Sequence, residues 1–201
     1  MSEAIEFYFD FSSPYGYLAS EKIDELAARY ERKVRWHPIL LGIVFRESGG
    51  VPLTLTAPIK SNYYLKDFSR SARYMDIPYT HPGNFPIATQ HAARAYYWLH
   101  GQDCSRARAF AHSAYRALFR EGRDLSDLAV VLDLACAAGA DRDALDDALA
   151  GPLLRERLKA ECAEAIARGV CGSPFIIVDS EPFFGADRLP QIAHWLETGG
   201  F

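Results

Sequence analysis

Cysteine is scarce in this chain, and no two of its cysteines form a CxxC pair. Among 201 residues there are four, at Cys104, Cys136, Cys162 and Cys171. They lie far apart, and no histidine pattern suggests a shared metal site. The sequence therefore signals neither a zinc site nor a disulfide framework. We expect buried thiols and no bound metal.

Basic clusters and long apolar runs are also missing. The net charge is −4 and the pI is near 5.9, so we expect no nucleic-acid partner, which would need clustered Lys and Arg. The apolar run 128–138 is interrupted by Asp133 and is too short to span a membrane. Acidic Glu3 and Glu6 stand where a signal peptide has its basic region. These features predict a cytoplasmic protein with no membrane partner.

The first forty residues have the pattern of a βαβ unit. Apolar and polar residues alternate over 4–11, which predicts a strand. Apolar residues at helical spacing predict a helix over 15–30, and alternation returns in 34–40. Such a unit places its two strands side by side and parallel, joined by a right-handed crossover.

The middle of the chain has helical patterns and no convincing strand. The predicted helices cover 60–75, 89–100, 105–119, 125–138, 142–150 and 155–168. Glycines between several of them are typical helix breaks. A long helical block after a βαβ unit indicates an insertion into a domain that is completed later in the chain.

The C-terminal part supplies a ββα unit. A buried strand is predicted over 175–178, an edge strand over 183–184, and a last helix from Asp187 to 196. Together with the βαβ unit, this order predicts an α/β fold of the thioredoxin-like class, βαβ…ββα. The predicted domains are a thioredoxin-like domain of residues 1–42 and 155–201 and an inserted α-helical domain of residues 43–154.

The first βα turn is the most informative site. Thioredoxin-like enzymes carry C-P-x-C at this helix N-terminus, and the same four positions here hold Ser13, Pro14, Tyr15 and Gly16. A dithiol reaction at this site is excluded. A serine hydroxyl can instead donate a hydrogen bond to a thiolate from a cofactor, and the helix N-terminus favours the same negative charge. Ser13 is also a good helix N-cap, and both roles can hold together.

A second element supports the fold prediction. Thioredoxin-like proteins place a cis-proline before the third strand, opposite the active-site helix, and Gly172-Ser173-Pro174 stands at that position. The plain alternative is a proline that only opens a strand. Because the Ser13-Pro14 turn and the ββα ending accompany it, we predict a cis Ser173–Pro174 bond.

Several motifs together suggest a family. Residues 7–19 read FYFDFSSPYGYLA, which resembles the F-Y-x-D-x-x-S-P-x-S/A-Y-L-A opening of the 2-hydroxychromene-2-carboxylate isomerases and the related kappa-class glutathione transferases. Residues 58–67 resemble the family's P-x-K-x-x-Y-x-x-x-D stretch. Residues 169–174 and 184–189 resemble its G-V-x-G-x-P and F-G-x-D-R-L endings. The resemblance covers essentially the whole chain.

The resemblance implies glutathione as cofactor. Ser13 would stabilise its thiolate, whose ordinary pKa is about 8.5. Main-chain groups of Gly172 and Ser173 would pair with its cysteinyl unit. Asp187 would meet the γ-glutamyl ammonium and cap the last helix, with simple capping as the alternative. The remaining cofactor-binding residues implied by the matched motifs are Lys60, which would pair with a carboxylate, Phe184, Gly185, Ala186 and Arg188.

The resemblance also implies a substrate and a reaction. Glutathione thiolate would add to 2-hydroxychromene-2-carboxylate, allow rotation about a former double bond, and leave as trans-o-hydroxybenzylidenepyruvate forms, a step of naphthalene-type aromatic catabolism. Asn84, Phe85 and Tyr64 would contact this small aromatic carboxylic acid. Asn84 also fits simple turn chemistry. The family resemblance further implies a homodimer.

Two departures from the family keep alternatives open. Gly16 replaces a small polar residue, and the loop 47–56 lacks the asparagine that some relatives have near the thiol. Thr54 or Thr56 is the candidate substitute. One alternative is a kappa-like glutathione transferase acting on another electrophile. The other is a non-catalytic thioredoxin-fold binding module, since a fold alone does not fix function.

Overall fold

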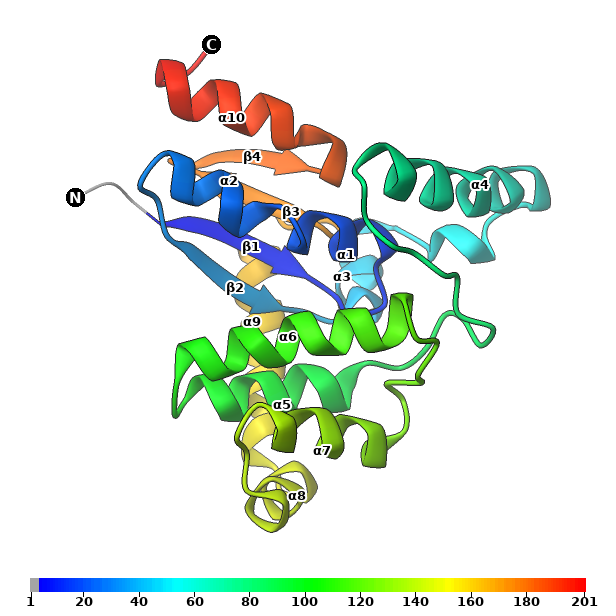
Figure 1. Cartoon of the computed structure of the whole chain (residues 1–201), viewed down its shortest axis with the longest axis vertical. Coiled ribbons are helices and arrows are strands. Elements are labelled where there is room, and N and C mark those ends of the chain that lie inside the picture. Colours follow the sequence, from blue (N-terminus) through cyan, green and yellow to red (C-terminus); the bar gives the residue numbers. More distant parts are fainter. Residues whose placement is uncertain (1–3) are drawn as a thin grey trace.

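A four-stranded mixed sheet forms the centre of the molecule (Figure 1). The computed structural model describes residues 4–201, so Glu3, part of the argument against a signal peptide, lies outside the described residues. The strands are β1 (Ile5–Phe9), β2 (Val34–Pro38), β3 (Phe175–Val178) and β4 (Glu181–Phe184), in the order β2-β1-β3-β4. β1 pairs parallel to β2 and antiparallel to β3, and β3 pairs antiparallel to β4. The predicted thioredoxin-like βαβ…ββα fold is confirmed.

Ten α-helices and two short 3-10 turns are described in residues 4–201. They are α1 (Pro14–Ser20), α2 (Ile23–Arg29), α3 (Leu41–Ser48), η1 (Leu53–Leu55), α4 (Pro58–Tyr74), α5 (Gln90–His100), α6 (Cys104–Phe119), α7 (Leu128–Ala137), α8 (Arg142–Ala150), α9 (Leu153–Ala167), η2 (Ala186–Arg188) and α10 (Leu189–Thr198). Figure 1 shows α1 and α2 in front of the sheet and α9 behind it, while α5 to α8 gather beside β2 and α4 extends to one side.

Three elements differ from the prediction. The helix expected over 15–30 is two helices, because the backbone leaves helical geometry at Lys22, with φ −124°. Residues 41–48, for which no helix was predicted, form α3, a short helix with no side-chain N-cap that is followed by Gly49 in the left-handed conformation. The last helix begins only at Leu189, because the turn η2 comes first.

One hydrophobic core joins the sheet to the helical part. Tyr96 and Tyr97 of α5 are buried, and their hydroxyls donate to the β2 carbonyls of Trp36 (3.0 Å) and Pro38 (2.8 Å). Side chains from the two predicted domains therefore pack into one hydrophobic core. The division into 1–42, 43–154 and 155–201 stays a prediction.

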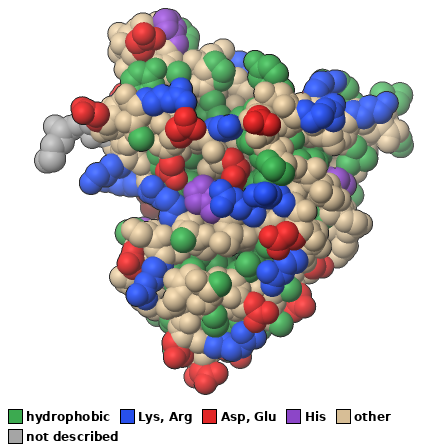
Figure 2. Space-filling model, viewed as in Figure 1, with side chains coloured by type: hydrophobic (Ala, Val, Ile, Leu, Met, Phe, Trp, Pro, Cys, Tyr) green, Lys and Arg blue, Asp and Glu red, His purple; other side chains and the backbone are tan. Residues whose placement is uncertain are grey.

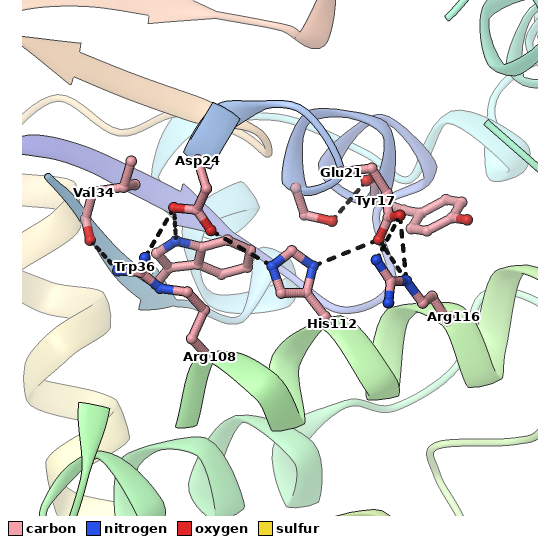
Figure 3. A network of polar contacts seen from close by, with 9 residues as sticks. Tyr17, Glu21, Asp24, Val34, Trp36, Arg108, His112 and Arg116 are labelled. Carbon is pink, nitrogen blue, oxygen red and sulfur yellow. Dashed lines mark hydrogen bonds and ion pairs between the residues drawn. The ribbon is translucent and has the colours of Figure 1, made fainter. Parts of the chain in front are cut away.

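A charged network also connects these parts, where α6 packs against α1 and α2 (Figure 3). The His112 ring of α6 lies 3.5 Å from Glu21 on one side and 3.5 Å from Asp24 on the other. Arg116 pairs with Glu21 at 2.9 Å, and Arg108 pairs with Asp24 at 3.2 Å. On the face drawn in Figure 2, basic, acidic and histidine side chains gather in a band across the middle.

Candidate functional site

A large cavity opens where β1 ends and α1 begins. Its volume is about 1810 Å³, and its lining comes from the α1 N-terminus, the 171–174 loop, the 184–187 turn, α4 and the 85–90 segment. Ligand sites commonly fill about 300–1,000 Å³, so this cavity has room for more than one small molecule. The predicted site residues that line it are Ser13, Tyr64, Phe85, Gly172, Ser173, Phe184, Gly185, Ala186 and Asp187.

Ser13 lies on the cavity wall at the start of α1. Its Oγ accepts a hydrogen bond from the Gly16 amide at 2.9 Å, so Ser13 is the helix N-cap that the sequence predicts. The same hydroxyl donates to the Ser173 carbonyl at 2.9 Å. Its one hydroxyl hydrogen is therefore already used in a hydrogen bond to the cis-proline loop. A thiolate that takes this hydrogen bond must compete with the Ser173 carbonyl.

Asp10, which the sequence analysis did not single out, organises the surrounding loops. Its carboxylate is buried and accepts hydrogen bonds from the Ser12 amide (2.8 Å) and from the Ser12 (2.9 Å) and Thr89 (2.7 Å) hydroxyls. It also accepts from the Leu41 amide at 2.7 Å. One buried acceptor thus ties together the first βα turn, the start of α3 and the start of α5. The aspartate of the FYFD motif was the available signal for this role.

The Asp10 main chain reaches the other side of the site. Its amide donates to the Ser173 hydroxyl at 3.0 Å, and its carbonyl accepts from the buried Tyr115 hydroxyl at 2.9 Å. The Ser173–Pro174 bond is cis, as the sequence predicts. Ser13 and the proline loop therefore face each other in a fixed arrangement.

Two glycines make this close approach possible. A Cβ at Gly16 would lie 2.6 Å from the Tyr115 hydroxyl oxygen and 2.9 Å from the Ser173 hydroxyl oxygen. A Cβ at Gly172 would lie 2.5 Å from the Phe184 ring. Contacts under 3 Å are essentially never made by real Cβ atoms. No side chain at position 16 fits this packing, so Gly16 leaves only its backbone to the site.

The turn at Asp187 differs from the prediction in one respect. Asp187 lies in η2, and α10 begins after Arg188 with no side-chain cap, so Asp187 does not cap the last helix. Its exposed carboxylate lines the cavity and pairs with Arg188 at 3.3 Å. Gly185 before it has φ 115°, a backbone region that favours glycine, and a Cβ there would lie 2.3 Å from the Asp187 carboxylate.

Three predicted site residues do not line the cavity. Lys60 is exposed in the first turn of α4. Asn84 is exposed and donates to the Asp124 carboxylate at 3.1 Å. Arg188 lies beside Asp187 and outside the lining. The roles proposed for these residues stay predictions.

Aromatic side chains of α4 and the 85–90 segment form part of the cavity lining, here called the aromatic wall. Tyr63, Tyr64, Phe68, Tyr74 and Phe85 all line the cavity. Phe68 is buried, and its ring stacks on Tyr64 and His81, so the Phe68 ring is held in place by its neighbours. The sequence analysis named Tyr64 and Phe85 and missed Phe68, because α4 has a mixed pattern in which wall and core cannot be separated.

The two loop threonines behave differently. Both line the cavity, and Thr56 donates its hydroxyl to the Leu53 carbonyl at 2.7 Å. The Thr54 hydroxyl oxygen is buried and has no hydrogen-bond partner among the described residues. Of the two candidates, only Thr54 keeps a hydroxyl that no described residue engages.

The cysteines are less buried than expected. Cys162 is buried, and burial raises the pKa of its thiol to about 11. Cys104 and Cys171 are exposed, and Cys136 is half-buried, so the expectation of four buried thiols is wrong. Their positions on helix ends and on the proline loop explain the difference. Within residues 4–201, no group of three or more His, Cys, Asp or Glu side chains is placed to hold a metal ion.

None of the helices described in residues 4–201 combines the length and the apolar character that crossing a bilayer requires.

The fold and the site define a thioredoxin-like protein of the DsbA type, with a serine in place of the reactive cysteine. The family model of the DSBA-like thioredoxin domain matches residues 4–197. A 2-hydroxychromene-2-carboxylate isomerase from Sphingobium xenophagum is 32% identical over 98% of this chain and 99% of its own length. The chain belongs to the DSBA-like thioredoxin family and, within it, to the family of the 2-hydroxychromene-2-carboxylate isomerases.

Further relatives agree with this placement. Glutathione S-transferase kappa 1 from Caenorhabditis elegans is 28% identical over 96% of this chain and 90% of its own length. A solved structure of a 2-hydroxychromene-2-carboxylate isomerase superposes with a TM-score of 0.88 at 27% identity, covering 97% of this chain and 95% of that one. The predicted family and the prediction of an isomerase-like enzyme are thereby confirmed.

Proposed function

We propose that the protein is a glutathione-dependent isomerase that interconverts 2-hydroxychromene-2-carboxylate and trans-o-hydroxybenzylidenepyruvate. The observation that carries the proposal is the position of the Ser13 hydroxyl. This hydroxyl caps α1 at a cavity that the aromatic wall also lines, and it donates to the carbonyl of Ser173 in the cis-proline loop. Relatives over nearly the whole chain are named for this isomerase and for glutathione transferases.

In this proposal the cavity holds glutathione with its sulfur at Ser13. The Ser13 hydroxyl donates to the thiolate, and the N-terminus of α1 adds favourable electrostatics, so the thiol ionises at neutral pH. The main chain at Gly172 and Ser173 pairs with the cysteinyl unit in an extended manner. Asp187 receives the γ-glutamyl ammonium, with Arg188 near the adjoining carboxylate. Lys60 reaches the glutathione from α4.

Glutathione, when bound, would supply a thiolate that can add reversibly to the conjugated double bond of the ring-opened substrate. Addition would allow rotation, and elimination of the same thiolate would give the trans product, so no atom or electron is gained or lost overall.

The protein's contribution is to generate the nucleophile and hold the ring. Hydrogen bonds to the thiolate act before addition, and fixed dipoles at the helix N-terminus and loop stabilise developing charge. The aromatic wall of Tyr63, Tyr64, Phe68, Tyr74 and Phe85 supplies an apolar surface for the planar substrate.

A second candidate is a kappa-like glutathione transferase acting on a neutral electrophile. Among the described residues, the lysines and arginines that line the cavity are Lys22 and Arg29, both from the α2 segment and not from the aromatic wall. A substrate carboxylate at that wall would meet no cation from the lining. This favours an electrophile without a carboxylate, and assays with both kinds of substrate decide between the two.

The first experiment is a glutathione titration with Ser13→Ala beside the wild type. Near-ultraviolet thiolate absorbance should rise and saturate at neutral pH in the wild type and vanish in Ser13→Ala. Ser20→Ala is the matched control, because Ser20 lies at the other end of α1 and its hydroxyl donates to the Tyr17 carbonyl at 2.7 Å. Absence of glutathione binding at millimolar concentration contradicts the proposal and leaves a thioredoxin-fold binding module.

The cellular setting is proposed on the family resemblance. We propose a cytoplasmic homodimer that serves aromatic catabolism. Light scattering on the purified chain measures its assembly state, and a monomer at micromolar concentration contradicts the dimer.

A further inference from the structure

Tyr15 and Asp67 meet where α1 touches α4. Tyr15 follows the Ser13-Pro14 turn, and its hydroxyl donates a hydrogen bond to the Asp67 carboxylate. Its ring packs edge-on against Phe68, with centroids 5.0 Å apart. Tyr15, Asp67 and Phe68 all line the cavity. The pair therefore lines the same cavity as Ser13 and touches the aromatic wall at Phe68.

The Asp67 carboxylate is held from several sides. It accepts hydrogen bonds from Arg70 and Tyr15 and a longer one from the Ser71 hydroxyl at 3.4 Å. Burial opposes its ionisation, but the hydrogen bonds from Tyr15 and Arg70 outweigh it and hold the pKa of Asp67 below its ordinary value. Burial and the bond to Asp67 both raise the pKa of Tyr15. At neutral pH the donor is the phenol and the acceptor is the carboxylate.

This proton assignment fixes what the Tyr15 hydroxyl can still do. A phenol has one hydrogen to donate and oxygen lone pairs that accept. The hydrogen is committed to Asp67, which is anionic and cannot return one. The Tyr15 oxygen can therefore still accept a hydrogen bond but cannot donate a second one. A polar group of a ligand that meets this oxygen is stabilised only when it brings a hydrogen of its own.

We propose that Asp67 is a positioning residue that orients the Tyr15 hydroxyl, so that the Tyr15 oxygen accepts a hydrogen bond from a hydroxyl on the second substrate. The inference rests on the proposed function, in which the reacting carbon of the substrate lies at the glutathione sulfur beside Ser13. Ser13 and Tyr15 line the same cavity at the start of α1, so a phenolic hydroxyl ortho to that carbon is a donor available within this cavity to the Tyr15 oxygen. Tyr15 is thus a specificity-determining contact, and it selects electrophiles that carry a hydroxyl donor over otherwise equal ones that do not.

The test compares two ligands that differ only in the donor. They are trans-o-hydroxybenzylidenepyruvate and its O-methyl ether. Each is titrated into protein saturated with S-methylglutathione, which has no nucleophilic thiol, so that binding is measured without turnover. We expect the wild type to bind the hydroxyl compound about tenfold more tightly, the factor expected for one hydrogen bond.

Variants at three positions assign the preference. Tyr15→Phe should bind both ligands alike. Asp67→Asn should do so as well, because an amide can donate as well as accept and leaves the Tyr15 hydrogen unassigned. In the double variant, Asp67→Asn should change the ligand preference no further than Tyr15→Phe does alone. Tyr30→Phe is the control, since Tyr30 lies at the end of α2 and does not line the cavity, so the tenfold preference should stay.

Three results would overturn the inference: no preference in the wild type, an unchanged preference in Tyr15→Phe, or an equal loss of preference in Tyr30→Phe. The thiolate titration of the same variants separates this outcome from failure of the proposed function. A thiolate signal in Tyr15→Phe with lost discrimination supports both ideas, whereas a normal thiolate signal with unchanged discrimination removes only the role of Tyr15.

Discussion

At the scale of single residues, the site depends on how closely its backbone segments approach one another. The Ser13 hydroxyl, the Ser173 hydroxyl and carbonyl, and the Tyr115 hydroxyl converge around Asp10 and the first turn of α1. Every one of these polar groups is paired, which is what burial demands. Gly16 stands among them because any larger residue would displace one of the partners.

Gly16→Ala should destabilise the protein by about 1–3 kcal/mol, since the added methyl group overlaps the fully buried Tyr115. Urea unfolding measures the loss. Gly42→Ala is the matched control, because a Cβ at Gly42, in the first turn of α3, meets nothing within 4 Å. That variant should gain up to about 1 kcal/mol from helix propensity. Equal changes in the free energy of unfolding at the two glycines would contradict the close packing of Tyr115 against position 16.

Sequence reasoning reached part of this site. The Ser-Pro turn, the Gly172-Ser173-Pro174 loop and the FG-x-D turn are local patterns, and each can be recognised without knowing its neighbours. Asp10, Tyr15 and Tyr115 act through partners that are up to 163 positions away in the chain, as in the bond from the Asp10 amide to the Ser173 hydroxyl. Spacing along a sequence cannot reveal such pairs, because they exist only after the fold brings them together.

At the scale of helices and strands, the boundary between α1 and α2 explains an error of the sequence analysis. Apolar spacing alone favours one helix over 15–30, but the chain breaks at Lys22. The break lies beside Glu21 and Asp24, the two carboxylates that flank His112 of α6. Tertiary contacts with α6 thus determine where α1 ends and α2 begins, which apolar spacing along the sequence does not show.

This junction predicts a pH dependence. Burial opposes the charge on His112, but the carboxylates of Asp24 and Glu21 outweigh it and raise its pKa. Burial likewise opposes ionisation of Glu21, and His112 and Arg116 outweigh it and lower its pKa. A raised histidine pKa stabilises the fold below the unfolded value of about 6.5, and this contribution is lost as pH rises through the folded pKa. The lowered Glu21 pKa stabilises above about 4.5 and is lost as pH falls.

His112→Gln should therefore cost most stability near pH 5.5, roughly 1 kcal/mol, and less above about pH 8. The measurement is the difference in free energy of unfolding between wild type and variant across this range. His194→Gln is the control, since His194 belongs to α10 and its ring stacks on Phe201, outside the network. A wild-type minus variant difference that is flat with pH, or that grows toward alkaline pH, rules out a charged His112 in the folded protein.

At the scale of the whole molecule, the order of elements was enough to predict the fold class. A βαβ start and a ββα end leave few topologies, because parallel neighbours need a right-handed crossover. The sheet order β2-β1-β3-β4 agrees. The helical middle was harder to place, because amphipathic periodicity shows that a helix has a buried face and does not show what covers it.

The contacts of α5 with β2 predict that sheet and helices unfold together, even though the sequence favours an inserted domain of residues 43–154. Tyr97 is buried and donates to the Pro38 carbonyl across the two predicted domains. Tyr97→Phe leaves that carbonyl without its donor and should cost about 1–3 kcal/mol. Helix content and tryptophan fluorescence should still report a single urea transition, with both probes shifted equally.

Tyr74→Phe is the matched control for the question of domain organisation. It removes a hydroxyl from a side chain that is 90% exposed and should leave the midpoint of the urea transition unchanged. The comparison is made in a Trp98→Phe background, because Trp98 lies in α5 and only Trp36 and Trp195 then report on the sheet side. If the inserted segment were an independent domain, Tyr97→Phe would separate the two probes, since the helix signal comes mostly from residues 43–154. Coincident transitions mean that the aromatic wall and the Ser13 turn belong to one cooperative unit, so the geometry of the cavity is only as stable as the whole chain.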